Sequence, residues 1–339
     1  MSVRIAVFRF YASHWRGAGH AMRCMTLARE LTKSGWECRF VTEPESYEFV
    51  PALKEFTRID QDHFSASPFP HDLLVVDHYD CGYDYENRFR PFAGAIMAID
   101  DLANRRRDCD ILLDQAYGRT VGDYARDVPK ECRILVGPTY ALLREEFSRR
   151  REEALARRKA VVDIKRIFIN FGGNDQKNMI LATITKLTNI GYKGAIDVVF
   201  GVMAEHRESV ESFARSMPNE VVFHTSPDMA DLMVRADMAV GAPASTAWER
   251  FCLGLPTLFV KTADNQTFTH DAILRDGLSL GEGIDDLSVK GMLVDFDRDY
   301  YMSCVKKCAG QTDGRGAQKI VSIIHEKLEE KNDLRQKAS

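Results

Sequence analysis

Two copies of one pattern dominate this chain: a short apolar run, a glycine turn and a run with helical spacing. The first copy has its apolar run at residues 4–10 and its turn at 17–19, and the second has them at 166–171 and 172–175. Short continuous apolar runs separated by loops or helices are typical of parallel strands buried on both faces. The sequence therefore predicts an α/β protein of two Rossmann-like domains that face one another across a cleft.

Further apolar runs complete each predicted sheet. They lie at 37–42, 73–76, 95–99, 111–113 and 133–136 in the first half, and at 196–200, 221–223, 238–240 and 257–260 in the second. Between residues 145 and 163 the composition shifts to Arg, Glu, Ala and Lys without glycine or proline, which indicates an exposed helix or linker. We therefore expect an N-terminal Rossmann-like domain at 1–146, a helical linker at 147–165, a C-terminal Rossmann-like domain at 166–312, and a helix with a charged tail at 313–339.

Length and charge restrict the classes of function. A chain of 339 residues is long enough for two α/β domains, and its net charge of -4 argues against a general nucleic-acid binder. No run reaches the roughly 20 apolar residues of a membrane span, and the apolar segment at 5–10 is too short for a signal peptide. We expect a cytoplasmic monomer without nucleic-acid or membrane partners. Its eight cysteines show no paired zinc spacing and most lie in apolar contexts, so we expect reduced core or surface thiols.

The first glycine turn puts His20 at the start of a predicted helix. Gly17 and Gly19 allow positive φ and close approach of a ligand, and a helix N-terminus offers unpaired N–H groups with partial positive charge. Such a turn can hold a phosphate-bearing ligand. Glycine turns between a strand and a helix also occur in many α/β folds without this role, so this motif alone does not assign a function.

A second candidate site follows the strand at 238–240. Ser245 or Thr246 can cap the next helix, and the same hydroxyls and N–H groups can bind a diphosphate. Glu249, one turn further, can accept hydrogen bonds from ribose hydroxyls. The alternative is a capped helix that carries an ordinary surface glutamate.

Polar residues also follow other predicted strands, notably at 77–79 and 263–266. Ligands of open parallel sheets bind at the carboxyl ends of the strands, where these residues would meet. An aspartate such as Asp77 often only ties a neighbouring loop, and that alternative stays open. No Asp-x-Asp clamp and no close His/Cys cluster occurs near a predicted sheet end, so we expect neither a metal nor another cofactor.

Eight short motifs, in order between residues 17 and 266, together resemble one family. They are Gly-x-Gly-His-x-x-Arg-Cys (17–24), Val-Val-Asp-His-Tyr (75–79), Ile-Asp-Asp-Leu-Ala-Asn-Arg (99–105), Cys-Asp-Ile-Leu-Leu-Asp-Gln (109–115), Tyr-Ala-Leu-Leu-Arg-Glu-Glu-Phe (140–147), Phe-Gly-Gly-Asn-Asp (171–175), Trp-Glu-Arg-Phe-Cys-Leu-Gly-Leu-Pro (248–256) and Asp-Asn-Gln (264–266). The chain resembles the UDP-2,4-diacetamido-2,4,6-trideoxy-β-L-altropyranose hydrolases of bacterial pseudaminic acid biosynthesis, which are relatives of the GT-B glycosyltransferases.

The resemblance implies a GT-B fold and metal-free, inverting hydrolysis of the bond between the anomeric carbon and UDP, with a UDP-sugar as substrate and UDP as product. It places the general base on His20 and the active-site asparagine on Asn265. UDP would lie against the second domain, near Gly172, Gly173, Gly241, Ser245, Thr246 and Glu249. We assign substrate contacts to Arg9, Gly17, Gly19, Asp77, Tyr79 and Arg144.

Two departures from the family pattern leave the sugar open: Tyr11 replaces a usual acidic residue, and Gln115-Ala116 replaces a common Gln-Asn. The expected mechanism has neutral His20 take a proton from water that attacks opposite UDP, while the helix that starts near Ser245 stabilises the departing diphosphate. Two other functions stay open. A GT-B glycosyltransferase would use an acceptor hydroxyl in place of water, and a noncatalytic sugar-nucleotide-binding protein would use His20 only structurally.

Overall fold

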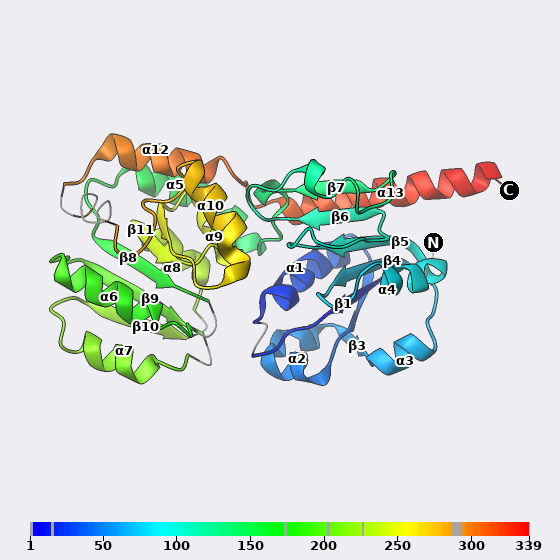
Figure 1. Cartoon of the computed structure of the whole chain (residues 1–339), viewed down its shortest axis with the longest axis horizontal. Helices are drawn as coiled ribbons and strands as arrows, with labels where there is room; N and C mark the ends of the chain where they lie inside the picture. Colours follow the sequence, from blue (N-terminus) through cyan, green and yellow to red (C-terminus); the bar gives the residue numbers. More distant parts are fainter. Residues whose placement is uncertain are drawn as a thin grey trace. The chain divides into compact units, whose positions relative to one another are not determined.

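The computed structural model describes residues 3–14, 17–172, 175–201, 204–225, 227–286, 293 and 295–338. The chain divides into two compact units (Figure 1), of which unit 1 comprises Met1–Leu143 with Arg315–Ser339 and unit 2 comprises Arg144–Gly314. Each unit is an α/β domain built on a parallel sheet. The predicted fold class of two parallel-sheet α/β domains is confirmed.

Unit 1 contains a seven-stranded sheet of order β3-β2-β1-β4-β5-β6-β7, in which all pairings are parallel. The chain runs outward from β1 to β3 and then returns to β4 on the other side of β1. This reversal makes the carboxyl ends of β1 and β4 a topological switch point, the place where open parallel sheets bind ligands. The strands are β1 (Ile5–Phe10), β2 (Glu37–Val41), β3 (Thr57–Ile59), β4 (His71–Asp77), β5 (Ala93–Ile99), β6 (Ile111–Asp114) and β7 (Arg133–Val136).

Helices cover both faces of this sheet. Ala6, Phe8 and Phe10 of β1 pack on one face with α1, whereas Val7 belongs to the cluster on the other face. Burial on both faces explains why β1 is continuously apolar apart from one arginine. The helices and 3-10 turns of unit 1 are α1 (Gly19–Lys33), α2 (Pro44–Phe49), η1 (Pro51–Glu55), α3 (Gln61–Ala66), α4 (Tyr83–Phe89), η2 (Arg90–Phe92), η3 (Val121–Asp123), η4 (Pro138–Tyr140) and α13 (Gly316–Ala338).

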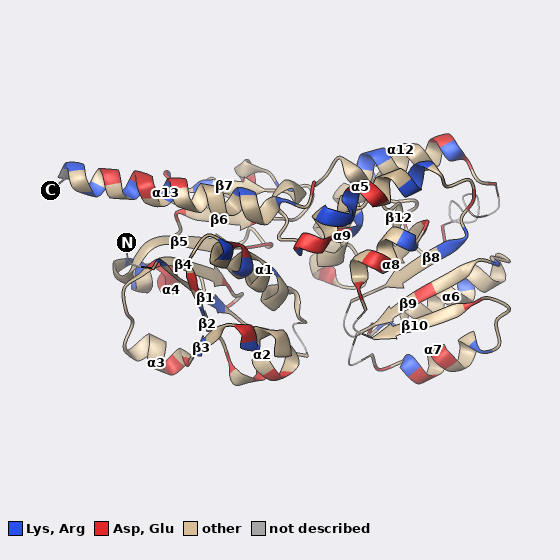
Figure 2. Ribbon diagram, turned by 180° about the vertical axis from the view of Figure 1, so that it is seen from behind, with Lys and Arg blue, Asp and Glu red and all other residues tan. Residues whose placement is uncertain are grey.

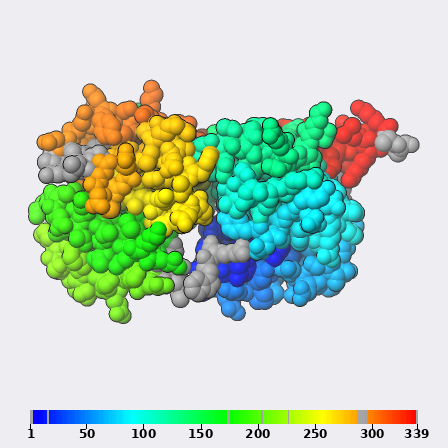
Figure 3. All heavy atoms as spheres, viewed as in Figure 1, coloured from blue at the N-terminus to red at the C-terminus, as the bar shows by residue number. Residues whose placement is uncertain are grey.

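The C-terminal helix α13 is part of unit 1, which differs from the separate helix and tail expected at 313–339. Ile320 and Ile324 are fully buried in the core that contains α1. Trp36 Nε1 lies 2.9 Å from His325 Nε2, and Lys331 pairs with Asp110 at 2.9 Å. Charges of both signs are interspersed along the helix (Figure 2), and its C-terminal end projects from the rest of unit 1 (Figure 3). Only that end behaves as the expected charged tail.

Unit 2 contains a five-stranded parallel sheet of order β10-β9-β8-β11-β12. Its chain reversal lies between β8 and β11, so unit 2 has a second switch point. The strands are β8 (Arg166–Asn170), β9 (Ala195–Phe200), β10 (Val221–Thr225), β11 (Met238–Gly241) and β12 (Thr257–Phe259). The helices and the 3-10 turn are α5 (Glu145–Lys159), α6 (Met179–Asn189), α7 (Arg207–Ala214), α8 (Met229–Arg235), α9 (Ser245–Cys252), η5 (Asp264–Gln266), α10 (Thr267–Arg275) and α12 (Arg298–Ala309).

Helix α5 belongs to unit 2, although its composition suggested an exposed linker at 147–165. Phe147 and Ala154 are fully buried, and so is Arg158, whose guanidinium donates to backbone carbonyls at the end of α8. A cation is favourable there because the C-terminal carbonyls of a helix carry partial negative charge. The long arginine therefore packs like a core residue, which polar composition alone does not indicate.

The described segments contain no helix with both the length and the apolar character that a membrane crossing needs. All eight cysteines are free, as predicted, and seven of them are buried.

Candidate active site

His20 and Asp77 meet at the switch point of unit 1. His20 is the second residue of α1 and Asp77 is the last residue of β4, directly beside Phe10 of β1 in the sheet. His20 Nδ1 lies 2.6 Å from Asp77 Oδ1. An ionised carboxylate only accepts hydrogen bonds, so Nδ1 carries the proton in this pair and Nε2 is the basic nitrogen of the ring.

Asp77 is completely buried and is bound by further side chains of α1. Arg23 donates to both carboxylate oxygens at 2.6 and 2.5 Å, and Cys24 Sγ lies 3.5 Å from Oδ2. Burial by itself raises the pKa of Asp77, but Arg23 and His20 outweigh it, so the pKa of this carboxyl lies well below its ordinary value. The direct substrate contact expected of Asp77 is therefore corrected: its carboxylate is used inside the protein to orient His20.

Tyr79 and Asp101 extend this cluster. The ring of Tyr79 packs edge-on against His20 with 4.9 Å between centroids, and its hydroxyl donates to Asp101 Oδ2 at 3.3 Å. Asp101 also pairs with Arg23 at 3.4 Å. Arg23 and Asp101 lie within the motifs at 17–24 and 99–105, but the sequence assigned neither of them a role in the site. Two signals were present, since Arg23 is one helical turn after His20 and Asp101 follows the strand that ends at Ile99.

Gly17 and Gly19 differ in backbone conformation and in the reason why glycine suits each position. Gly17 has φ of +78°, in the left-handed region, and its N–H donates to Ser13 O at 2.7 Å. Gly19 is the first residue of α1, where an added Cβ would meet no described atom within 4 Å. The conformation requires glycine at 17, whereas at 19 the structure leaves open space beside the backbone.

Arg9 does not lie where the sequence suggested. Its side chain is only 3% exposed, and it pairs with Glu43 Oε1 at 2.8 Å. It also donates to the carbonyl oxygens of Phe10 and Val41 at 3.1 and 3.3 Å. The predicted substrate contact of Arg9 is therefore wrong, because its guanidinium joins the ends of β1 and β2.

In unit 2 the N-terminus of α9 lacks a side-chain cap. Ala244 is the N-cap residue and makes no capping hydrogen bond, while Ser245 and Thr246 are the first two helical residues. The expectation that Ser245 or Thr246 caps this helix is therefore wrong. Since the first N–H groups of a helix have no intrahelical partner, α9 keeps an anion-binding end at the edge of the β8–β11 switch point.

Helix α6 has the opposite arrangement. Asp175 accepts hydrogen bonds from the backbone N–H groups of Met179 and Ile180 at 2.8 and 3.0 Å. A protein carboxylate thus occupies the place that a phosphate would take. Gly172 precedes this turn with φ of +89°, whereas the predicted nucleotide contact Gly173 lies outside the described residues.

Gly241 is explained by packing within unit 2. It is the last residue of β11, and an added Cβ would overlap Asn170 O and Arg250 Nη1. Arg250 is fully buried beneath the start of α9, where it donates to the carbonyls of Ala242 and Thr246 at 2.5 and 3.2 Å. Burial lowers the pKa of Arg250 to about 10, so the side chain is still a cation at neutral pH.

Glu249 and Arg144 lie together in unit 2, although the expected boundary at residue 146 assigned Arg144 to the first domain. Arg144 Nη2 lies 3.4 Å from Glu249 Oε1. Glu249 is one turn inside α9 and its side chain is 13% exposed, so it is not an ordinary surface glutamate.

Asn265 lies in η5 and is exposed. The turn that presents it is fixed by Gln266, whose Oε1 accepts hydrogen bonds from Thr262 N, Thr262 Oγ1 and Ala263 N at 2.9, 3.2 and 3.3 Å. Asn265 belongs to unit 2 and His20 to unit 1.

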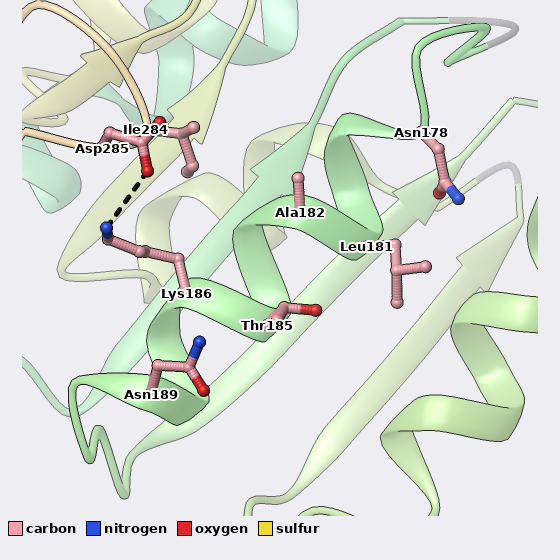
Figure 4. A pocket seen from close by; sticks show the side chains of 8 residues that line it. All are labelled: Asn178, Leu181, Ala182, Thr185, Lys186, Asn189, Ile284 and Asp285. Carbon is pink, nitrogen blue, oxygen red and sulfur yellow. Dashed lines mark hydrogen bonds and ion pairs between the residues drawn. The ribbon is translucent and has the colours of Figure 1, made fainter.

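A surface hollow of about 500 Å³ lies elsewhere in unit 2, along α6 (Figure 4). Lys186 and Asp285 pair across part of it at 3.1 Å. None of the predicted site residues lines it. This hollow is therefore separate from the candidate residues of unit 2.

Two curated proteins are similar to this chain over most of their length. The chain is 27% identical over 336 residues to the spore coat polysaccharide biosynthesis protein SpsG of Bacillus subtilis, which covers 93% of this chain and 96% of that protein. It is 26% identical over 288 residues to a UDP-2,4-diacetamido-2,4,6-trideoxy-β-L-altropyranose hydrolase of Campylobacter jejuni, which covers 80% of this chain and 96% of that protein. No protein-family model matches the chain.

Solved structures share the fold at low sequence identity. MurG of Acinetobacter baumannii superposes with a TM-score of 0.61 at 15% identity, covering 95% of this chain and 99% of that one. The UDP-GlcNAc 2-epimerase of Neisseria meningitidis, solved with UDP-GlcNAc, superposes with a TM-score of 0.64 at 11% identity. That superposition covers 95% of this chain and 100% of the epimerase chain. The predicted GT-B fold class, with its two parallel-sheet α/β domains, is therefore confirmed.

Proposed function

We propose that this protein is a hydrolase that cleaves the bond between UDP and the anomeric carbon of UDP-2,4-diacetamido-2,4,6-trideoxy-β-L-altropyranose. The observation that carries the proposal is the 2.6 Å contact between His20 Nδ1 and Asp77 at the switch point of unit 1. The similarity to the Campylobacter jejuni hydrolase along nearly its whole length supports the substrate class. The eight ordered motifs support the same family.

His20 acts as the general base. Asp77 holds the Nδ1 proton, so Nε2 accepts a proton from water. The water oxygen forms a bond to the anomeric carbon from the face opposite UDP, and the bond from that carbon to the diphosphate oxygen breaks. UDP leaves with the electron pair, and the anomeric configuration is inverted. Tyr79, beside the His20 ring, and the open backbone at Gly19 would contact the sugar.

Unit 2 binds the nucleotide. The uncapped N-terminus of α9, with the Ser245 and Thr246 hydroxyls, meets the diphosphate charge. Glu249 accepts hydrogen bonds from the ribose, and Asn265 contributes to the reacting end of the substrate. Helix N–H groups and hydroxyls stabilise the leaving group in this proposal without a metal ion.

Turnover of this UDP-sugar in H₂¹⁸O, with no acceptor added, tests the proposal. We expect free sugar and UDP in equal amounts, ¹⁸O in the sugar by mass spectrometry, and the inverted anomer as the first product by NMR. Excess chelator should leave the rate unchanged. A rate that collapses with chelator would refute the metal-free mechanism.

Other outcomes identify the competing functions. Label found in UDP would mean that the phosphate–oxygen bond breaks, which contradicts inversion at carbon. Sugar release that depends on an added acceptor would identify a glycosyltransferase. UDP binding without turnover of any diacetamido UDP-sugar would identify a noncatalytic binding protein.

A further inference from the structure

The structure describes a hydrogen-bond partner for one carboxylate oxygen of Glu249 and none for the other. Oε1 contacts Arg144 Nη2 at 3.4 Å. Oε2 is buried and has no hydrogen-bond partner among the residues that the structure describes. A buried acceptor without a donor is unfavourable, which indicates that a donor from outside the chain completes this carboxylate.

Arg144 is itself held in place from α5. It precedes the first residue of that helix, and its Nη1 pairs with Glu146 Oε1 at 2.9 Å. Its guanidinium also lies over the ring of Phe147, with 5.1 Å to the centroid. These contacts hold the guanidinium so that Nη2 lies toward Glu249. The guanidinium is thus already engaged by Glu146, Phe147 and Glu249 within the protein.

The charges around Glu249 act in opposite directions. Burial raises the pKa of its carboxyl, Arg144 gives the largest opposing effect, Glu146 raises the pKa further and Arg250 lowers it. The charge of Glu249 in turn helps to raise the pKa of the Cys252 thiol on the same helix. The net result is a raised pKa, and Arg144 is the group that most favours the ionised form.

We infer that Arg144 is a positioning residue for ribose recognition: it holds Glu249 as an oriented carboxylate whose second oxygen, Oε2, accepts hydrogen bonds from the ribose hydroxyls of the bound nucleotide. Arg144 acts through Glu249 and does not touch the substrate, which differs from the contact that the sequence suggested. The inference rests on the proposed binding of UDP to unit 2. Its consequence is selection of ribonucleotides over 2′-deoxyribonucleotides.

The test compares the dissociation constants of UDP and 2′-deoxy-UDP, measured by calorimetry on the full chain. The wild-type protein should prefer UDP by about tenfold or more, the value of a hydrogen bond to a charged acceptor. Arg144→Gln should bring the ratio close to one, and Arg144→Lys should retain part of it. Arg149→Gln is the matched control, because Arg149 is an exposed arginine of the same helix.

A second comparison shows whether Arg144 acts through Glu249. In the Glu249→Gln background, Arg144→Gln should produce no further change in the ratio, because the carboxylate that it orients is already absent. In the single variant Arg144→Gln, the pKa of Glu249 rises. UDP affinity should therefore fall at a higher pH than in the wild type as the solution is acidified.

The outcomes separate the inference from the proposed function. A wild-type protein that binds no UDP overturns both. UDP binding with an unchanged ratio in Arg144→Gln overturns the inference alone and shows that Arg144 serves only to anchor α5 through Glu146 and Phe147. Equal loss of UDP and 2′-deoxy-UDP affinity in Arg144→Gln also overturns it, because the ribose hydroxyls are then not what Arg144 controls.

Discussion

His20 Nδ1 and Asp77 Oδ1 lie 2.6 Å apart although 57 positions separate the two residues along the chain. The contact exists because β1 and β4 are parallel neighbours, with Phe10 beside Asp77, and α1 starts just after β1. Arg23, one turn along α1, holds the other side of the same carboxylate. The orientation of the candidate base is thus built into the strand order.

Replacing His20 by Ala or Asn should remove the base without removing the nucleotide site. We expect turnover to fall by about 10²-fold or more, the usual contribution of a general base. UDP affinity should stay unchanged, because its proposed contacts belong to unit 2. Steady-state kinetics and UDP calorimetry check the two halves of this prediction, and near-normal turnover in either variant would refute the assignment.

Replacing Asp77 by Asn should destabilise the protein in a pH-dependent way. The variant removes the carboxylate that lies nearest the Arg23 guanidinium and leaves Asp101, at 3.4 Å, as its carboxylate partner. Losing one partner of a buried pair costs about 3–5 kcal/mol. The native pKa of Asp77 is depressed, so its stabilisation is present above the unfolded pKa near 4 and is lost as the pH falls towards the native value. The difference in the free energy of unfolding between the wild type and Asp77→Asn, measured with urea, should therefore be constant at pH 5–7 and shrink below about pH 4. Exposed Asp333→Asn is the control, and an equal loss there would contradict the prediction.

Asp114 should make the free energy of unfolding depend on pH in the direction opposite to that of Asp77. Its carboxylate is buried with Tyr124 and Arg119, and burial raises its pKa to about 6. The native state then binds more protons than the unfolded state between about pH 4 and 6, so stability falls as the pH rises through that window. The loss of folding stability across this window is on the order of 3 kcal/mol, because the pKa is raised by about two units. Asp114→Asn should remove this slope, and unfolding curves that run parallel to the wild type across the window would contradict it.

A carboxylate placed at Ala244 should compete with the nucleotide. Ala244 is the uncapped N-cap of α9, and an aspartate there would bond the first N–H groups and stabilise the helix by about 1 kcal/mol. Its charge would repel a diphosphate at the same helix end. We expect Ala244→Asp to raise the melting temperature and weaken UDP binding, and Ala244→Asn to stabilise with a smaller loss of affinity. Unchanged UDP affinity in Ala244→Asp would show that the diphosphate does not use α9.

Two glycines should respond differently to alanine. A Cβ at Gly241 overlaps Asn170 O and Arg250 Nη1, so Gly241→Ala should destabilise by about 1–3 kcal/mol or more. A Cβ at Gly19 meets no described atom within 4 Å, so Gly19→Ala should leave the melting temperature unchanged or slightly higher. Thermal unfolding measures both variants. Equal changes in melting temperature would mean that the overlap at Gly241 does not determine the loss of stability in Gly241→Ala.

The apolar runs predicted most strands to within one or two residues, since a strand buried on both faces must be apolar throughout. The strand β3 (Thr57–Ile59) was missed because this edge strand is short and mostly exposed. The sequence predicted the C-terminal helix and the helix at 147–165 but placed both outside the two domains, because both have highly charged sequences. Their buried residues belong to cores that are assembled from distant parts of the chain.

By itself the sequence determined the two parallel α/β domains and the position of His20 at a helix start after a glycine turn. These are local properties, set by apolar runs, helical spacing and backbone freedom. Only the tertiary structure decided which charged groups are already paired. In the folded chain Arg9 pairs with Glu43, and Asp77 contacts His20. Asp175 accepts hydrogen bonds at the N-terminus of α6, whereas the N-terminus of α9 has no side-chain cap. Such pairings depend on strand order and burial, because a charge finds its partner across the fold and not along the chain.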